Sequence, residues 1–423
     1  MKVHCRWLAG LGSPVRVASL VRVTSLVRVA SLVNVTSLVL VVSLALMATP
    51  SMAEVKVGMV APFSGVASSL GEGMRQGIKA RFAEANESGG VHGETLTLVT
   101  RDDGYEPLRS AKATRELLED DDILAMLGNV GTPTAIVNLP ILLDHEMPLI
   151  GAFTGSGVLR QSPPDRYVFN YRASYAQETA TMIEGLLLAG IAPEEIAFFT
   201  QADGYGDAGY QGALRSLANH GYSHPERLAH GRYTRGTRNV HRGLANVLQA
   251  PVTPRAVIIV GTYGPAADFI REARKDLPNA LFLNVSFVGS QALLDELGDA
   301  AEDVIVTQVV PPYESDLPGV KAYREALQAE DASADENFVS LEGYLAASLF
   351  IKGLDAAGAD ADREALVDGL EGLGDIDLGL GKSLTLGPKD HQASNSVWTT
   401  RIHDGQFEPV DWFTLLDDVA AKE

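Results

Sequence analysis

The 423-residue chain carries 34 Lys and Arg against 54 Asp and Glu, which gives a formal net charge of −20, and 46% of its residues are hydrophobic. Such an acidic balance repels nucleic acid and anionic membrane surfaces, so we expect neither as a partner. The only cysteine, Cys5, lies near the N-terminus, which excludes disulfides, a cysteine nucleophile and a cysteine-ligated metal from the rest of the chain.

The first 53 residues have the pattern of an export signal. Lys2 and Arg6 give a basic start, residues 31–47 are almost wholly apolar, and Ser51-Met52-Ala53 offers small residues at the positions that a signal peptidase reads. We therefore predict a signal peptide at 1–53, cleaved after Ala53, and a periplasmic mature protein. A permanent membrane anchor is the alternative, because the apolar run approaches the ~20 residues needed to span a bilayer.

From Glu54 onward, short β-branched runs alternate with longer amphipathic runs, a pattern typical of βαβ units around a parallel sheet. We expect strands at 55–60, 95–101, 124–128, 149–151, 196–200, 256–260, 281–285 and 304–308. We expect helices at 71–86, 107–119, 134–143, 177–190, 206–220, 265–275 and 336–357. These are too many strands for one ordinary lobe, so the predicted fold class is α/β with two doubly wound parallel-sheet lobes.

We predict that the chain passes between the lobes at three places. The first follows Arg172, and the second is at Pro311-Pro312, because prolines cannot continue a strand ladder. The third is needed if residues 396–402 rejoin the second lobe. Three crossings form a three-stranded hinge beside a cleft that can close on a ligand. The predicted parts are 54–172 plus 312–376 for the N-terminal lobe and 173–311 plus 377–423 for the C-terminal lobe.

Three loops after predicted strands, 127–134, 151–156 and 201–206, have the composition of ligand-binding turns. In parallel α/β lobes, ligands bind beyond the carboxyl ends of strands, where helix N-termini offer free N–H groups. Glycines and hydroxyls let the backbone approach a small anion closely, so a carboxylate-bearing solute is the natural occupant. The alternative is that Thr132 and Thr154 merely cap helices and turns, and spacing alone does not decide between the two.

Five segments in fixed order resemble one family. They are VGMVAPFSG at 57–65, NESGGVHG at 86–93, DDG at 102–104, the loop that ends in Thr132, and YGDAG at 205–209. In this order and at these distances they are similar to the leucine/isoleucine/valine-binding family, the branched-chain amino-acid-binding proteins that serve ABC transporters. The resemblance covers residues 54–410 and implies the type I periplasmic binding protein fold.

The resemblance also implies roles for residues of the first lobe. Thr132 and nearby N–H groups would hold a ligand carboxylate. Thr154 and the carbonyl of Ala152 would hold an α-amino or other polar group, and Phe153 lies between these two residues in the predicted site. Leu70 would contact the side chain of the ligand.

In the second lobe, the resemblance implies that Tyr205 and Tyr263 close over the ligand, although ordinary interlobe packing is the alternative for both rings. One position departs from the family pattern. Where amino-acid-binding members have an acid for the ligand ammonium, this chain has Ser286-Phe287. Because a buried ammonium without a carboxylate partner costs several kcal/mol, we expect Ser286 to serve as a neutral hydrogen-bond partner for an apolar or aromatic carboxylate at least as well as for an amino acid.

Two local clusters have simpler interpretations. A metal site is not expected at the histidines, because Gly221 and Pro225 prevent a helical i,i+4 pair. These histidines are His220, His224, His230 and His241. Arginines stand out nearby and favour a solvated face over a partner site. These arginines are Arg227, Arg232, Arg235, Arg238 and Arg242.

The sequence contains no Gly-x-Ser-x-Gly, His-Glu-x-x-His or phosphate-loop motif, so we expect no enzyme activity, no cofactor and no metal. The predicted function is that of the extracytoplasmic solute-binding component of an ABC importer. Its partners would be a small-molecule solute and the permease subunits in the inner membrane, and we expect a monomer. The alternative is a periplasmic ligand-sensing module that reports to a signalling partner.

Overall fold

The computed structural model describes residues 53–423 except 121, 411, 413–414 and 416–423. The predicted signal peptide at 1–53 lies outside the described residues apart from Ala53. Among the described residues, no helix combines the length and apolar character needed to cross a membrane.

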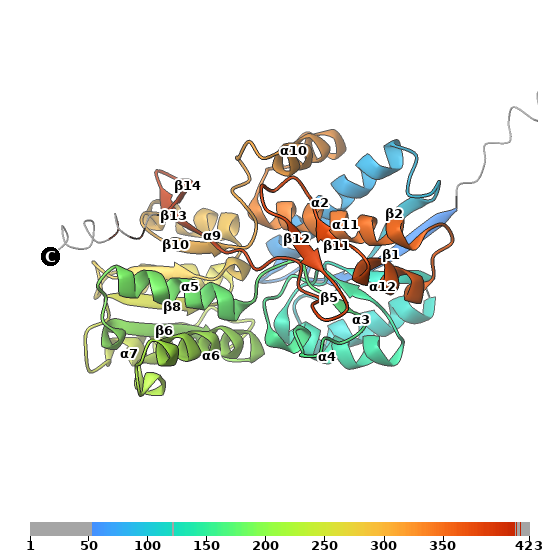
Figure 1. Ribbon diagram of the computed structural model, residues 1–423. Coiled ribbons are helices and arrows are strands. Elements are labelled where there is room, and N and C mark those ends of the chain that lie inside the picture. Colours follow the sequence, from blue (N-terminus) through green and yellow to red (C-terminus); the bar gives the residue numbers. More distant parts are fainter. Residues whose placement is uncertain (1–52, 121, 411, 413–414, 416–423) are drawn as a thin grey trace, which may run out of the picture. The chain divides into compact units, whose positions relative to one another are not determined.

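The first lobe is built on a five-stranded parallel sheet with the strand order β2-β1-β3-β4-β5. Its strands are β1 (Glu54–Ala61), β2 (Thr95–Asp102), β3 (Ile123–Leu127), β4 (Leu149–Ile150) and β5 (Val168–Phe169). Its helices are α2 (Ser68–Glu87), α3 (Pro107–Asp120), α4 (Thr132–Asp144), α10 (Pro318–Glu330), α11 (Phe338–Ala357) and α12 (Arg363–Glu371). In Figure 1, α2 lies against α11, and α3 lies beside α4.

The second lobe has a seven-stranded sheet with the order β14-β13-β10-β9-β8-β6-β7. Its strands are β6 (Ile196–Gln201), β7 (His230–Tyr233), β8 (Ala256–Val260), β9 (Leu281–Asn284), β10 (Ile305–Gln308), β13 (Trp398–His403) and β14 (Gln406–Pro409). The pairs β10–β13 and β13–β14 are antiparallel and the others are parallel. Its helices are α5 (Tyr175–Leu188), α6 (Gly204–Asn219), α7 (His241–Leu248), α8 (Tyr263–Ala273) and α9 (Ser290–Leu297).

The chain passes from one sheet to the other in separate segments. The segment after β5 runs beside a late segment of the chain, because Asn170 N–H donates to His391 O at 2.7 Å and Ser394 N–H donates to Tyr171 O at 2.8 Å. After β10 the chain reaches α10, which packs on α2 of the first lobe. The tail then pairs with β10 as β13, and Figure 1 shows β13 and β14 next to β10, where they form one edge of the second sheet.

A small hairpin crosses one predicted lobe boundary. Strand β11 (Gly374–Ile376) pairs antiparallel with β12 (Leu384–Leu386), so the boundary predicted between 376 and 377 cuts a paired element. Gly319 of α10 also donates its N–H to Gly379 O at 2.9 Å. Residues 377–386 therefore contact first-lobe elements, and hydrophobic burial at Leu384 and Leu386 fixes the hairpin there.

The expected core strands and helices all form, and the two-lobed α/β class is confirmed. Helix α4 begins two residues earlier than predicted, at Thr132, and α2 begins three residues earlier, at Ser68. Several short or polar elements were not predicted from the sequence. These are β5, β7, α7, α9, α10, α12, β11, β12 and β14.

Candidate functional site

Two threonines of the first lobe meet at the carboxyl ends of neighbouring strands. Thr132 follows β3 and Thr154 follows β4, and because these strands pair in parallel, the two loops lie side by side. The hydroxyl oxygens are 2.6 Å apart, and both side chains are completely buried. We call this pair the threonine corner. It brings two small hydroxyl groups, each able to donate or accept a hydrogen bond, to one point between the lobes.

The threonine corner is not a helix cap. The N-cap of α4 is Gly131, which makes no side-chain cap hydrogen bond, and Thr132 is already the first helical residue. Gly131 has a φ of 110°, and a Cβ there would lie 2.6 Å from the Tyr105 ring, so glycine is required for the loop to turn so tightly. Thr154 does accept a hydrogen bond from Ser156 N–H at 3.3 Å, so this hydroxyl also stabilises its own turn.

Aromatic rings from both lobes fill the space around the threonine corner. Phe287 of the second lobe lies with its ring centroid 5.3 Å from that of Phe153 and 6.2 Å from that of Tyr105, both in the first lobe. Within its own lobe, its ring lies 4.7 Å from Tyr205 and 6.3 Å from Tyr175. All five rings are buried, so the lobes are closed on one another in this structure. Such ring pairs stabilise the closed arrangement beyond their area burial.

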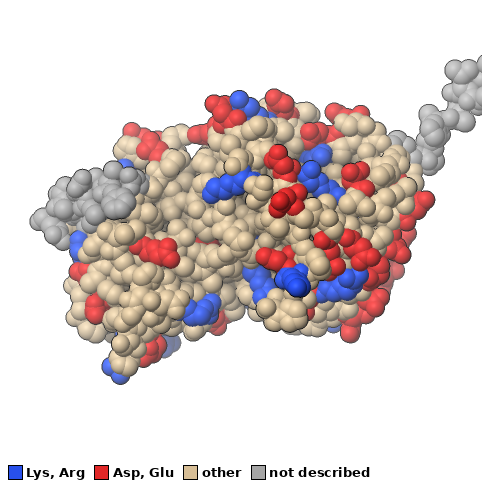
Figure 2. Space-filling view, viewed as in Figure 1, with Lys and Arg blue, Asp and Glu red and all other residues tan. Residues whose placement is uncertain are grey.

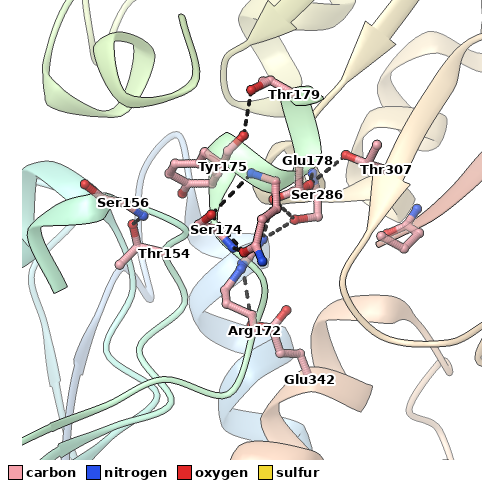
Figure 3. A network of polar contacts seen from close by, with 12 residues as sticks. Thr154, Ser156, Arg172, Ser174, Tyr175, Glu178, Thr179, Ser286, Thr307 and Glu342 are labelled. Atoms are coloured by element: carbon pink, nitrogen blue, oxygen red, sulfur yellow. Dashed lines mark hydrogen bonds and ion pairs between the residues drawn. The ribbon is translucent and has the colours of Figure 1, made fainter. Parts of the chain in front are cut away.

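A buried network of charged and polar groups adjoins these rings (Figure 3). We call it the hinge network, and its members are Arg172, Glu178, Ser286, Thr307 and Glu342. Arg172 Nη2 donates to the Ser286 hydroxyl and lies 3.3 Å from Glu178 Oε1, and Arg172 Nη1 lies 3.5 Å from Glu342 Oε1. These three charged side chains are 0–3% exposed. The network joins the first crossing, α5 and a loop of the second lobe to α11 of the first lobe.

Glu178 is the acid that contacts Ser286. Its Oε2 accepts from the Ser286 N–H at 2.8 Å and from the Thr307 hydroxyl at 2.6 Å, and its Oε1 accepts from the Ser286 hydroxyl at 3.0 Å. An acid is therefore present at Ser286, but it comes from α5 and not from the loop after β9. Its hydrogen bonds hold Ser286 in position.

Glu342 differs from Glu178 in how completely it is paired. Burial raises the pKa of Glu342 to about 7, although the Arg172 guanidinium opposes the rise. Glu342 Oε1 has no hydrogen-bond partner among the described residues. Burial opposes the charge of Arg172, but Glu342 and Glu178 outweigh this effect and raise the pKa of Arg172 above its usual value. The guanidinium therefore stays charged.

Arg160 links the threonine corner to the hinge network. Its guanidinium donates to Thr154 O at 3.2 Å, to Ser156 O at 2.9 Å and to Arg172 O at 3.0 Å. A planar guanidinium with five donors can fix several carbonyl groups at once. Arg160 therefore fixes the position of the Thr154 backbone relative to the Arg172 backbone.

Leu70 and Tyr263 meet at a second point between the lobes. A Cβ on Gly289 would lie 2.5 Å from Leu70 Cδ2 and 3.6 Å from Tyr263 Cδ1, which places both side chains against this glycine. Leu70 is completely buried and also lines a pocket of about 340 Å³ between α2 and α9. This pocket is rimmed by acids such as Glu72 and Asp295.

The structure thus sorts the predicted site residues into two groups. One surrounds the threonine corner and Phe287, and the other, Leu70 and Tyr263, surrounds Gly289. The first group consists of Thr132, Ala152, Phe153, Thr154, Tyr205 and Ser286. The Ala152 carbonyl already accepts from Thr154 N–H at 2.8 Å. The sequence analysis did not indicate a further set of residues that distant segments bring together beside the threonine corner and Phe287. These are Tyr105, Arg172, Tyr175, Glu178 and Glu342. The Arg172–Tyr175 stretch was recognised only as a crossing.

The histidines and arginines discussed above have separate partners. His230 Nε2 lies 2.7 Å from the Thr200 hydroxyl, and His220 Nδ1 lies 2.8 Å from Ser216 O. Arg238 pairs with Asp268 at 2.6 Å. Among the described residues, the group whose ligand atoms come close enough for a metal is Glu302, His403 and Asp404 at the surface.

One interlobe ion pair was not foreseen. Arg235 of the second lobe lies 3.2 Å from Glu106 of the first lobe, and nearby Gln201 Nε2 donates to the Tyr105 hydroxyl at 3.4 Å.

Figure 2 shows acidic side chains spread over the visible face, especially over the first lobe, with basic side chains among them. The surface therefore carries the excess of acid that the composition predicts.

Comparisons with known proteins agree with this architecture. The family model for periplasmic binding proteins matches residues 54–406. The Leu/Ile/Val-binding protein BraC3 of Rhizobium johnstonii is 25% identical over 344 residues, which span 78% of this chain and 87% of that protein. Leu/Ile/Val-binding protein homolog 7 of Brucella abortus is 25% identical over 349 residues, 73% of this chain and 80% of that protein.

Solved structures give the same result. A possible leucine/isoleucine/valine-binding protein from Rhodopirellula baltica is 46% identical, with a TM-score of 0.85, and the match covers 87% of this chain and 100% of that one. A substrate-binding periplasmic protein from Ralstonia solanacearum is 28% identical, with a TM-score of 0.75, covering 82% of this chain and 97% of that one. The expected resemblance and the type I fold are confirmed, and this chain belongs to the periplasmic binding protein family.

Proposed function

We propose that the protein is the extracytoplasmic solute-binding component of an ABC importer and that it captures a small carboxylate-bearing solute between its lobes. The observation that carries this proposal is the threonine corner, where two buried hydroxyls meet beside aromatic rings from both lobes. The permease subunits in the inner membrane would receive the solute, and no chemical reaction on it is proposed.

The polarity of the site supports an anionic group at the threonine corner. Two guanidinium groups, Arg160 and Arg172, lie next to it, and hydroxyls and N–H groups can satisfy a carboxylate well. Among the described residues, the Tyr175 hydroxyl makes no well-formed hydrogen bond although its ring is buried. Burial raises the pKa of Tyr175, while the Arg172 guanidinium and the Thr154 and Thr132 hydroxyls oppose this rise. A carboxylate can accept from such a group.

The rings support a solute with an apolar or aromatic part. Phe153 and Tyr105 from the first lobe and Tyr205 and Phe287 from the second would enclose that part when the lobes close. Relatives named for binding leucine, isoleucine and valine agree with a small carboxylate-bearing solute. An amino acid and an apolar or aromatic carboxylate both belong to the proposed class.

Unbiased mass spectrometry of small molecules released from the denatured, purified protein tests the proposal. We expect a carboxylate to be released, and a thermal-shift screen should show stabilisation by the same compound, because a ligand that binds only the folded state stabilises it by mass action. Release of an uncharged sugar or a metal ion would contradict the proposal.

We further propose export with cleavage after Ala53. We propose lobes that comprise 54–172 with 312–386, which keeps the β11–β12 hairpin in the first lobe, and 173–311 with the tail from β13. The small residues before Glu54 support the cleavage site. N-terminal sequencing of protein from the periplasmic fraction should give Glu54 as the first residue. Full-length protein retained in the membrane fraction would instead support the N-terminal anchor.

A further inference from the structure

Arg172 is a buried cation that faces the candidate ligand site with unused hydrogen-bonding capacity. Its side chain is 0% exposed, and its Cζ lies 4.8 Å from the centre of the Phe153 ring and 5.8 Å from that of Tyr175. Among the described residues, Arg172 Nε and Nη1 have no hydrogen-bond partner, although Nη1 lies 3.5 Å from Glu342 Oε1. Buried donors without partners are costly, so their presence beside a ligand site points to the ligand as their acceptor.

Glu178, in contrast, has no capacity left for a ligand. A carboxylate offers about four lone-pair sites, and Glu178 accepts from the Ser286 N–H, the Ser286 hydroxyl, the Thr307 hydroxyl and Arg172 Nη2. An ammonium group of a ligand would have to displace one of these donors. The acid nearest Ser286 therefore does not act as a free partner for an amino acid.

The backbone of Arg172 and the ring against its guanidinium both lie next to the threonine corner. Arg160 binds Thr154 O and Arg172 O through the same guanidinium, which fixes both backbones near one point. The Phe153 ring beneath the Arg172 guanidinium belongs to the residue before Thr154. In the view of Figure 3, Tyr175 lies between Thr154 and Glu178. The guanidinium therefore lies against the ring of the residue that precedes Thr154, beside the proposed carboxylate site.

We propose that Arg172 is a specificity-determining residue that selects solutes with a hydroxyl or keto oxygen on the carbon next to the carboxylate, that is, α-hydroxy and α-keto acids. This inference rests on the carboxylate site of the proposed function. The solute oxygen would accept from Arg172 Nε and Nη1, and a charged guanidinium makes stronger hydrogen bonds than a neutral donor. An α-ammonium at the same point would face a like charge at close range.

Glu342 provides the competing arrangement. Its Oε1 lies 3.5 Å from Arg172 Nη1 but has no hydrogen-bond partner among the described residues, so it can accept from a solute ammonium. In that case the protein would prefer α-amino acids. The two arrangements make opposite predictions for the same set of solutes, which allows a direct test.

The test is calorimetric titration of ligand-free protein with two sets of matched solutes. One set is isocaproate, α-hydroxyisocaproate, α-ketoisocaproate and leucine, and the other is phenylpropanoate, phenyllactate, phenylpyruvate and phenylalanine. In the set that binds, we expect the α-hydroxy or α-keto acid to bind about tenfold or more tightly than the plain acid and more tightly than the amino acid, as hydrogen bonds to a charged group require.

The Arg172→Lys variant separates recognition from folding. Lysine keeps the positive charge between Glu178 and Glu342 but lacks the planar fork of donors. We therefore expect the variant to bind the α-hydroxy or α-keto acid and the plain acid with affinities within about threefold of each other. Arg324→Lys is the matched control, because Arg324 donates to Tyr313 O at 2.8 Å and to Ser315 O at 3.0 Å in the first lobe, away from the site. It should leave the preference unchanged. Circular dichroism would establish that both variants are folded.

Three results would overturn the inference. A tighter affinity for the amino acid would favour Glu342 as the selecting group, and equal weakening of every solute by Arg172→Lys would assign Arg172 a structural role only. Both leave the proposed carboxylate site intact. If no carboxylate of either set binds, the inference and the proposed carboxylate site fail together.

Discussion

The threonine corner and the hinge network lie close together but are built in different ways. The threonine corner comes from two loops that follow adjacent parallel strands. Its two threonines are 22 residues apart in sequence, so the pairing of β3 with β4 determines its position. The hinge network brings together groups as far apart in sequence as Arg172 and Glu342, from a crossing segment and a distant helix. The threonine corner buries neutral hydroxyl groups, and one hydrogen bond between them offsets much of the cost of burial. The hinge network buries charged groups, and these destabilise the fold if one partner is removed.

This difference predicts the largest effect for Arg172→Met. The substitution leaves Glu178 and Glu342 buried without their cation, which should cost about 3–5 kcal/mol in the free energy of unfolding. Urea denaturation of the purified protein measures this cost. The triple variant that also carries Glu178→Gln and Glu342→Gln should recover part of it. A loss below about 1 kcal/mol for Arg172→Met would show that the network contributes little to stability.

Phe287→Ala compares packing between lobes with packing inside one. Phe269 is buried within the second lobe, with its ring 3.9 Å from that of Phe199, and Phe269→Ala should cost about 3–5 kcal/mol. Phe287→Ala should cost less, because the lobes can part without unfolding, and small-angle scattering should show a larger radius of gyration. Equal costs with no expansion would mean that the lobes do not separate in solution.

Glu342→Gln should change the pH dependence of stability. The folded-state pKa of Glu342, about 7, exceeds its ordinary value of 4.5, so the folded protein binds more protons than the unfolded chain between these values. The free energy of unfolding should therefore fall as pH rises from about 4.5 to about 7, by up to about 3 kcal/mol from this group. Glu342→Gln removes this contribution. Parallel urea titrations of both proteins across the range would test it, and identical slopes would contradict it.

Thr132→Val tests the corner with little change of shape. Loss of one hydrogen bond to a charged carboxylate should weaken solute binding by roughly 1.5–3 kcal/mol, or about tenfold or more. Thr134→Val is a useful control, since the Thr134 hydroxyl donates to Val130 O at 2.7 Å and to no solute-facing group. Calorimetry with the released solute measures both. If Thr134→Val weakens solute binding as much as Thr132→Val does, the threonine corner has no specific role in binding the carboxylate.

Glu106→Gln should have the smallest effect. The Glu106–Arg235 pair spans the lobes, but the two side chains are 49% and 24% exposed, and partly exposed ion pairs contribute about 0–1 kcal/mol. Solute affinity should change by less than about fivefold, and the change should shrink further in high salt. A larger, salt-independent loss in calorimetry would show that this pair governs closure.

The sequence allowed prediction of the fold and indicated the two loops that form the threonine corner, because both follow from local patterns. Alternating runs gave β1, β3 and β8, and the loop composition after two strands indicated Thr132 and Thr154. The hinge network could not be predicted in the same way. Nothing near Glu178 or Glu342 distinguishes these acids from solvated ones, and their burial depends on how α5 and α11 pack around the first crossing. The loop after β9 contains no acid, as the sequence shows, but Glu178 of α5 contacts Ser286 in that loop.

The most direct test of carboxylate capture compares each acid with its uncharged amide. Isothermal calorimetry of wild-type protein with isocaproate, leucine and phenylpropanoate, each beside the corresponding carboxamide, isolates the carboxylate while keeping the apolar part. The account predicts that binding is confined to the acids, with at least a tenfold loss for the amide of any acid that binds. Equal binding of an acid and its amide would contradict the role of the threonine corner as a carboxylate site.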